Sequence, residues 1–333
     1  TTASNNTAVG KAALGANTTG ANNVAVGASS LLNNTTAADN VAVGVSALAA
    51  NTTGTNNTAV GRAALSTNST ASDSTAVGQT ALQLNTTGTG NTAFGRSALM
   101  ANTTGSSNVA VGRFALDANT TGNDNIAIGY LALSANTTAV SNTVVGAGSM
   151  VACTTGHDNT SMGVNSAYGL TTGDNNLLLG VSAGRATSPS GNITTEDNRI
   201  CLGNNSITDA YIKVDWTVTS DQRDKADITN FTHGLNYVNE LRPVNYVWDD
   251  RSNYEDRISD GSKKKSDVQL GFLAQEVAAI ETDLGIDNNA IVNTEDADLL
   301  KMTNVKLIPV LVNAIQELST KNDALVARIT ALE

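Results

Sequence analysis

The chain has 333 residues, a net charge of −11, 15% charged residues and 4% aromatic residues. The acidic balance excludes a surface built for nucleic acid or for an anionic membrane, because phosphate binding needs clustered Lys and Arg. No apolar run reaches the roughly 18 residues that a membrane-spanning helix needs, so we also expect no membrane insertion.

The sequence opens on Thr1 rather than Met, as expected for a fragment or a processed product of a longer chain. Its first part repeats the motif Thr-Ala-Val-Gly, with close variants, in steps of 17 residues without insertion or deletion. A twelfth copy, ending at Gly203, follows after a 23-residue step that contains the loop signal Ser-Pro-Ser-Gly. The eleven regular copies end at Gly10, Gly27, Gly44, Gly61, Gly78, Gly95, Gly112, Gly129, Gly146, Gly163 and Gly180.

One repeat unit reads Asn-Thr-Ala-Val-Gly-x-x-Ala-Leu-x-x-Asn-Thr-Thr-Gly-x-Asn. Its glycines and threonines disfavour helix, and a repeat of two helices needs about 34 residues. Short β-favouring tetrads separated by turn residues instead predict a mainly β fold, a stacked solenoid of eleven 17-residue coils over residues 1–205. We expect the repeated asparagines to form amide ladders, the glycines to make corners with positive φ, and Ala, Val and Leu to point inward.

A core of Ala, Val and Leu is thin for a single chain. We therefore expect each coil to hide one face against identical copies, in a homotrimer around a common axis. Through its Asn-x-Ala-Val-Gly motif and its short, constant period, the array resembles the head of trimeric autotransporter adhesins and the shafts of some phage tail fibres. The resemblance covers roughly residues 5–205 and implies a trimeric β-solenoid.

Three other interpretations of the array are weaker. The Asn-Thr-Thr triplets match the N-glycosylation sequon, but the repeat produces them automatically, and we interpret them as turn chemistry. The Gly-Gly-x-Gly-x-Asp motif of calcium-binding repeats is absent. Ice binding stays a remote option, because the two threonines of each coil are adjacent and precede a turn glycine.

Patterns for metal binding and for glycan cleavage are sparse. Cys153 and Cys201 lie far apart, and His157 and His233 are too few for a typical zinc site. We therefore expect no metal and no cofactor. A glycan-degrading site needs paired carboxylates, and residues 1–219 contain only 10 Asp or Glu, which makes that function a poor fit.

From residue 206 the composition changes. Residues 206–219 are typical of a strand and predict a neck between the array and the tail. Residues 234–248 predict an amphipathic helix that is broken by a proline and continues as an alternating strand. Residues 268–281 predict a short strand that runs into a helix, and the chain is expected to be helical from about Asn304.

The last predicted helix carries a heptad repeat. Leu at every d position predicts a coiled coil over about 304–333, rather than an amphipathic helix packed only on its own domain. Ile at a, Leu at d and one Asn at a usually favour two strands. The array favours three, and we expect three. The a positions are Ile308, Ile315, Asn322 and Ile329, and the d positions are Leu311, Leu318, Leu325 and Leu332.

Charge is concentrated in Ser-Asp-Gln-Arg-Asp-Lys, residues 220–225, where the two styles of sequence meet. A Ser–Lys pair can act as nucleophile and base if the lysine is neutral. Residues at this spacing lie roughly 17 Å apart on a strand and share no face on a helix, so the chain must turn between them. Burial or Arg223 would favour a neutral lysine, whereas Asp221, Asp224 and Asp227 would disfavour it. On residue chemistry alone, an N-cap and turn leading into a domain is the simpler interpretation.

Four segments follow one another in the last third of the chain. They are SDQRDKADI (220–228), LNYVNELRPVNYVW (235–248), GFLAQEV (271–277) and KLIPVLVNAIQEL (306–318). Together they resemble the intramolecular chaperone of phage tail fibres and tailspikes, of the peptidase family S74 type. The resemblance implies an α+β chaperone domain over residues 220–333 that trimerises, guides the folding of the solenoid and then cuts itself off.

The resemblance also implies a catalytic dyad. In the family, the serine that opens the domain and a lysine five residues later cleave the chain, and these positions are Ser220 and Lys225 here. The cut is expected at the boundary formed by Thr219, Ser220 and Asp221. The implied activity is that of a self-cleaving serine endopeptidase that acts once in cis. We expect burial in the trimer to switch this activity on.

The two resemblances together imply a phage tail fibre, with a shaft that binds the host surface. Its expected partners are two further copies of itself and a host cell-surface receptor, a glycan or an outer-membrane component. The expected location is the virion tail fibre, assembled in the bacterial host cytoplasm. Two alternatives stay open, a bacterial trimeric surface adhesin with a related chaperone domain and a structural trimerisation domain without cleavage. The heptads run to Glu333 with no membrane β-strands after them, which favours the fibre over the adhesin.

Overall fold

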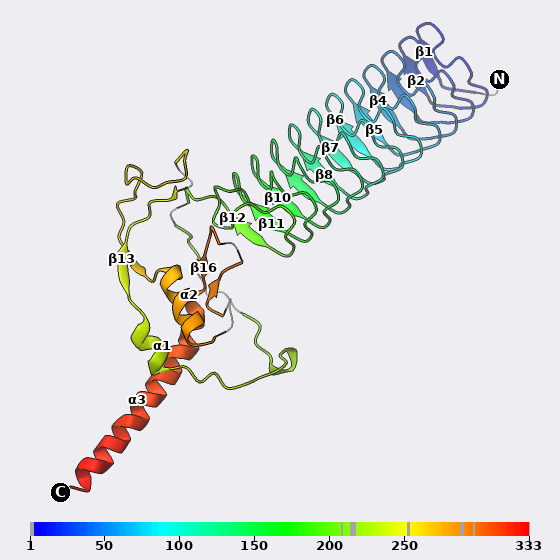
Figure 1. Cartoon of the computed structure of the whole chain (residues 1–333). Coiled ribbons are helices and arrows are strands. Elements are labelled where there is room, and N and C mark those ends of the chain that lie inside the picture. The colour runs from blue at the N-terminus through cyan, green and yellow to red at the C-terminus, as the bar shows by residue number, and fades with distance from the viewer. Residues whose placement is uncertain are drawn as a thin grey trace. The chain divides into compact units, whose positions relative to one another are not determined.

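A computed structural model describes residues 3–207, 209–213, 218–251, 254–286, 290–295 and 297–332. The chain divides into two compact units, Thr1–Ala210 and Tyr211–Glu333 (Figure 1). The first unit is a parallel β-solenoid, and the second is a smaller unit of helices and hairpins that ends in a long helix.

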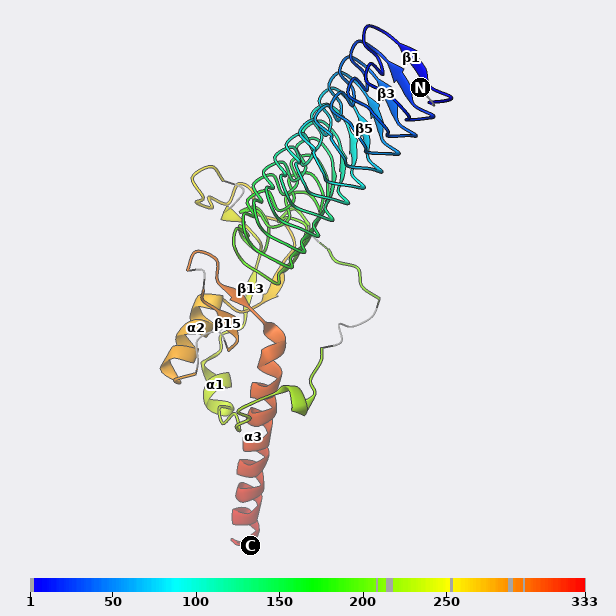
Figure 2. The ribbon, with the colours of Figure 1, turned by 90° about the vertical axis from the view of Figure 1, so that its right-hand side faces the viewer.

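Twelve short strands form one parallel sheet along the first unit (Figures 1 and 2). Each strand is a tetrad without its glycine and pairs in register with the strand of the next coil, as Ala25 does with Ala42. The predicted mainly β class and solenoid are thereby confirmed. The strands are β1 (Thr7–Val9), β2 (Val24–Val26), β3 (Val41–Val43), β4 (Thr58–Val60), β5 (Thr75–Val77), β6 (Thr92–Phe94), β7 (Val109–Val111), β8 (Ile126–Ile128), β9 (Thr143–Val145), β10 (Thr160–Met162), β11 (Leu177–Leu179) and β12 (Ile200–Leu202).

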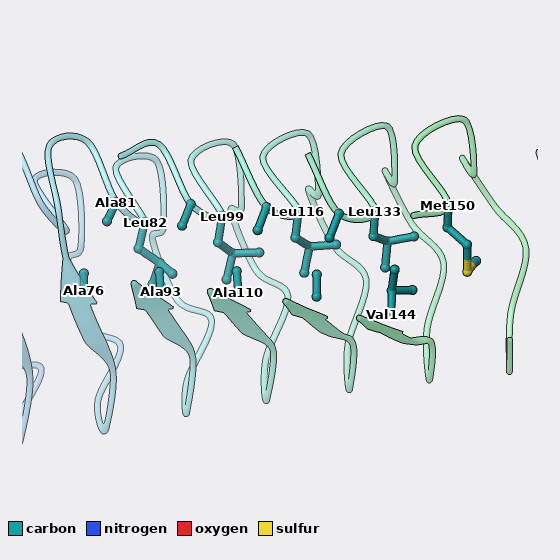
Figure 3. Close-up of a cluster of buried hydrophobic side chains, with 14 of the residues drawn as sticks. Ala76, Ala81, Leu82, Ala93, Leu99, Ala110, Leu116, Leu133, Val144 and Met150 are labelled. Atoms are coloured by element: carbon teal, nitrogen blue, oxygen red, sulfur yellow. The ribbon is translucent and has the colours of Figure 1, made fainter. Parts of the chain in front are cut away.

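The core of the solenoid is narrower than the sequence predicted. From β2 onward, the middle residue of each strand is buried, as Ala93 and Ala110 are, whereas the flanking positions are at least partly exposed. The expectation that the tetrad valine points inward is therefore wrong, because side chains alternate along a strand and a three-residue strand turns only its centre to the core. Leu99 and Leu116 reach from the segment after the strand toward these alanines (Figure 3).

Two ladders of buried asparagine run along the solenoid, as the repeat predicted. In the first ladder, each amide donates to the asparagine one coil earlier and to a nearby carbonyl; Asn102 donates to Asn85 Oδ1 and to the Gly105 carbonyl, both at 2.8 Å. In the second, Asn91 Oδ1 accepts the backbone N–H of Asn108 at 2.9 Å. The ladders satisfy polar groups in a core that is fully buried. The members of the first are Asn17, Asn34, Asn51, Asn68, Asn85, Asn102, Asn119 and Asn136.

The first ladder ends where the repeat loses its asparagine. Cys153 occupies the next position, and its thiol donates to the Gly156 carbonyl at 3.6 Å. Burial raises the pKa of the Cys153 thiol to about 11, so the group stays uncharged. Asn136 Oδ1, which would accept from an asparagine at 153, is buried without a hydrogen-bond partner. The end of the ladder therefore carries the cost of one unpaired acceptor.

Glycine makes the corner after each strand of the array. Gly95 has a φ of +133°, and a Cβ on it would lie 2.7 Å from the backbone carbon of Gly112 in the next coil. The predicted glycine corners are thus confirmed. Other positive φ values fall on residues that rarely adopt them, among them Leu99 at 54° and Leu116 at 53°. The stacking of the coils, and not local preference, holds leucine in this conformation.

The second unit contains three α-helices and two antiparallel hairpins among the residues described. The helix and strand within 234–248, the strand and helix within 268–281, and the closing helix are all as predicted. The hairpin β15–β16 was not predicted, because two-residue strands carry no periodic pattern. The elements are η1 (Gln222–Asp224), α1 (Leu235–Glu240), β13 (Val244–Tyr246), β14 (Gln269–Gly271), α2 (Ala274–Asp283), β15 (Val292–Asn293), β16 (Lys301–Met302), η3 (Asn304–Lys306) and α3 (Leu307–Thr330).

The core of the second unit is small. Glu281 on α2 is only 2% exposed, and its carboxylate accepts the backbone N–H groups of Ile291 at 2.8 Å and Val292 at 3.2 Å. Only the first turns of α3 reach this core, and the rest of the helix projects from the unit (Figure 2). The buried cluster consists of Tyr237, Val277, Ile291, Val292, Leu307 and Val310.

The predicted neck is not a strand in the part that the structure describes. Residues 206–207, 209–213 and 218–219 have no strand assignment. A strand needs a neighbour to receive its backbone hydrogen bonds, and none of these residues pairs with one. The remainder of this prediction, which includes Trp216, lies outside the described residues. The two units divide between Ala210 and Tyr211, inside the segment predicted as the neck.

Candidate active site

The candidate site is built on the turn η1 at the start of the predicted chaperone domain. Asp221 has an extended backbone, and its carboxylate accepts the backbone N–H of Arg223 at 2.9 Å, which caps the turn. The backbone N–H of Lys225 then closes the turn on the Gln222 carbonyl at 3.1 Å. The chain thus turns across the residues where a Ser220–Lys225 contact requires it.

The turn brings the two predicted dyad side chains into direct contact. Lys225 Nζ donates a hydrogen bond to Ser220 Oγ at 2.6 Å. This separation is within the range of a nucleophile and its base, whereas an extended chain would hold the two residues roughly 17 Å apart. The structure therefore provides the contact, while the catalytic roles of both residues and the cleavage boundary at Thr219 and Asp221 stay predictions.

An ion pair between Asp221 and Arg223 fixes the turn. Arg223 Nη2 lies 2.6 Å from Asp221 Oδ2, and Arg223 Nε lies 3.1 Å from Asp221 Oδ1. Hydrogen bonds from the Arg223 side chain and then from its backbone N–H lower the pKa of Asp221, and the same pair raises the pKa of Arg223. The guanidinium is thus engaged with Asp221 and is not directed at Lys225, contrary to the expected help from Arg223.

The contact is exposed to solvent in the single chain. Ser220, Arg223, Asp224 and Lys225 are all exposed, and Asp221 is partly exposed. A lysine acts as a base only after losing a proton, and burial favours the neutral amine. The geometry of the pair is therefore complete in one chain, but the surroundings that would activate it are not.

The segment GFLAQEV makes structural contacts. Glu276, in the first turn of α2, forms an ion pair with Arg242, which precedes β13 in the chain. The bonded carboxylate raises the pKa of Arg242. We assign no catalytic role to Gln275 or Glu276. Sequence reasoning missed this pair and also missed Glu281, although an acidic residue inside an apolar helical segment is a signal for a buried acceptor.

Groups that could hold a metal ion are absent from the part of the chain that the structure describes, since no three His, Cys, Asp or Glu side chains gather there. Cys153 and Cys201 are buried free thiols. No described helix is both long enough and apolar enough to cross a membrane.

Part of the C-terminal region is similar to a known protein family. Residues 220–286 match the family described as chaperone of endosialidase, a peptidase family. The match begins at Ser220 and ends before η3, so the closing helix lies beyond it. It indicates a trimerisation chaperone of the tail-fibre or tailspike type with self-cleaving peptidase activity. A search of curated proteins and a search of solved structures each found no match.

Proposed function

We propose that this chain is part of a phage tail fibre whose C-terminal domain drives trimerisation and folding and then releases itself by autoproteolysis at Ser220. One coincidence carries the proposal. The family match begins at Ser220, and the hydroxyl of that same residue is hydrogen-bonded to Lys225 Nζ at 2.6 Å. The chain would act once, in cis, as a serine endopeptidase with a Ser–Lys dyad.

The proposed cleavage uses this contact directly. Neutral Lys225 Nζ takes the hydroxyl proton while Ser220 Oγ attacks the peptide carbonyl at the boundary with Thr219. The tetrahedral intermediate collapses to an ester, and the departing amine takes the proton from Nζ. Water then hydrolyses the ester, which leaves a new carboxyl terminus and restores the serine hydroxyl. The reaction needs no cofactor.

Assembly is the proposed trigger. In the single chain both dyad side chains are exposed, and water stabilises a charged amine. A neighbouring copy that covers η1 would remove this water. Asp221 is already paired with Arg223 within the turn. Cleavage would then follow trimer formation and mark its completion.

The proposed homotrimer is supported by the heptad face of α3. An amphipathic helix packed only on its own domain would bury this face, but Leu307, Val310 and Ala314, which lie on another face, are the buried residues of α3. The heptad face is therefore available to other copies. The apolar a and d residues that are exposed are Ile308, Leu311, Ile315, Leu318, Leu325, Ile329 and Leu332.

The outer face of the solenoid sheet supports the same proposal. The last residue of each strand is apolar and at least partly exposed, and β6, β10 and β12 contribute Phe94, Met162 and Leu202. Parallel stacking in register places these side chains in one continuous column. Contiguous exposed apolar surface of this kind marks an interaction site.

For the finished fibre, we propose a host cell-surface receptor, a glycan or an outer-membrane component, as the partner of the shaft. The proposed location is the virion tail fibre, after assembly in the bacterial host cytoplasm. Both proposals rest on the kind of chaperone that the C-terminal region resembles. A trimeric surface adhesin with a related chaperone would instead be found on the bacterial envelope, which fractionation of virions and host cells distinguishes.

The test of autoproteolysis is a denaturing gel with intact mass measurement of the whole expressed chain. Wild type should give two fragments, near residues 1–219 and 220–333, and the masses identify the bond that is cut. Ser220→Ala and Lys225→Ala should each remain one chain. Lys264→Ala, in an exposed loop outside η1, should cleave like wild type. A wild-type chain that forms trimers but stays intact would contradict cleavage and leave a structural trimerisation domain.

A further inference from the structure

The second unit has an apolar groove beside the start of α3. Its volume is about 430 Å³, and it lies between β14 and the first two turns of the helix. Leu270 on β14 stands at its edge with 77% of its surface exposed. Covering an open apolar groove of this size would remove apolar surface from water, which is favourable in free energy. Its lining consists of Pro243, Leu270, Gly271, Phe272, Asn304, Leu307, Ile308 and Leu311.

The groove is continuous with the heptad face of α3. Ile308 and Leu311 line the groove, and they are also the first a and d positions of the repeat. Leu307, which forms the floor beside them, is the g position that precedes this heptad. A second helix packed along the a and d residues must therefore pass the mouth of the groove.

The e positions of α3 are unusual. In coiled coils, e and g residues are commonly Glu or Lys. Here Val312 and Val326 are both at e, both exposed to a similar extent, at 45% and 54%. In a parallel coiled coil a g residue faces the e residue of the next heptad on the neighbouring helix. That rule places Val312 of a neighbour opposite Leu307, at the groove.

We infer that, in the assembled protein, the groove of each copy receives Val312 from the α3 helix of a second copy of this chain. The inference rests on the proposed trimerisation. It adds a second contact between copies, beside the contact between the a and d residues of their α3 helices. The groove exists only when β14 packs beside α3. The helices would therefore associate fully only between chains whose chaperone domain has already folded.

A disulfide test measures this contact directly. Leu270→Cys combined with Val312→Cys, in a chain that also carries Ser220→Ala to keep the domain attached, should cross-link separate chains on a non-reducing gel. Leu270→Cys with Val326→Cys is the matched control, because Val326 lies about 21 Å further along the helix. The native Cys153 and Cys201 are buried and should not contribute. The control pair should stay unlinked.

The assembly test compares two charges at the same heptad position. Val312→Glu should weaken association at least roughly 10-fold more than Val326→Glu, because only the first would place a carboxylate in an apolar groove. Sedimentation equilibrium on the Ser220→Ala chain gives both values. Leu270→Lys should restore part of the association lost by Val312→Glu.

The outcomes separate this inference from the proposal beneath it. A chain without Val312→Glu that sediments as a monomer would overturn trimerisation itself. Trimers in which Val312→Glu and Val326→Glu associate equally well would overturn only the role of the groove. Cross-linking of the control pair to the same extent as the Val312 pair would overturn it as well.

Discussion

The solenoid and the C-terminal unit differ in how completely each covers its own polar groups and apolar side chains. In the solenoid, each coil is completed by the next stretch of the same chain, through asparagine ladders and fully buried alanine and leucine. The C-terminal unit has a small core and leaves the heptad face of α3 exposed. A coil is thus completed by its own chain, whereas the heptad face of α3 is left exposed in the single chain.

This difference teaches where substitutions should act. Along the solenoid, a changed residue disturbs contacts within one chain, to the coil before and the coil after. On α3, a changed residue on the exposed face should leave the single chain intact and act on the proposed association. The same chemical substitution should therefore have two different readouts in the two units.

The largest effect is expected at a solenoid corner. Gly95→Ala adds a Cβ at a φ of +133°, against the backbone of Gly112. Strain and overlap together should destabilise the array by more than about 3 kcal/mol, measured by chemical denaturation. Gly90→Asn is the control in the same coil, since Gly90 has a φ of +66° and Asn56 occupies the equivalent position at 58°. Equal losses for the two variants would contradict the need for glycine at the corner.

The next prediction tests the comparison directly, because it makes the same Leu→Ala substitution once in each unit. Leu116→Ala removes a side chain that is 0% exposed and should destabilise the solenoid by about 2–5 kcal/mol. Leu325→Ala removes one that is 53% exposed and should raise the concentration needed for assembly instead. Thermal unfolding followed by circular dichroism reports the first effect, and sedimentation reports the second. A Leu325→Ala chain that assembles like wild type would contradict the prediction that α3 forms a coiled coil.

A smaller effect is expected inside the ladder. Asn102→Ala deletes the hydrogen bonds donated to Asn85 and Gly105 and the one accepted from Asn119. The buried acceptor on Asn85 is then unpaired, and the loss should cost about 2–3 kcal/mol. Asn22→Gly is the exposed counterpart: it removes the amide that donates to Asp39 at 3.0 Å, and glycine tolerates the φ of 57°, as Gly90 does at the equivalent position. Its cost should stay within about 0.5 kcal/mol. Similar midpoints of denaturation for both variants would show that burial does not determine how much these hydrogen bonds contribute to the free energy of unfolding.

The smallest effect is expected at the end of the ladder. Cys153→Asn gives Asn136 Oδ1 the donor that it lacks and keeps the contact to the Gly156 carbonyl. Its own oxygen would then face Leu170, so the unpaired acceptor moves one coil along. The net gain should therefore be no more than about 1 kcal/mol, read as a small rise in the denaturation midpoint. Cys153→Ala, which gives Asn136 no donor, should show no such rise.

The sequence predicted the solenoid well because the same contacts recur in every coil. The constant 17-residue step fixed the coil length, and the repeated Asn and Gly marked the ladders and the corners. The inward direction of the tetrad valine was wrong, because only the centre of so short a strand faces the core. The left-handed leucines, such as Leu99, could not be predicted, since stacking overrides a local preference that points the other way.

The candidate site was predictable only in part. Turn-forming residues between Ser220 and Lys225 indicated that the chain could bend, and η1 shows that it does. The pairing of Arg223 with Asp221 depends on which rotamers the turn permits, and sequence spacing does not carry that information. The groove was also invisible in the sequence, because it forms between β14 and α3, which are far apart along the chain.

The constancy of the 17-residue step has a consequence for alignment between molecules. Side-by-side solenoids that are offset by one whole coil would meet nearly the same residues, so the array alone would not define the alignment of neighbouring copies. Irregular positions, such as Phe94 on the outer face and the 23-residue step before Gly203, are the places where an offset would bring different residues together. A C-terminal domain that joined the copies at one end would align their first coils. The irregular positions would then only stabilise an alignment that is already in place.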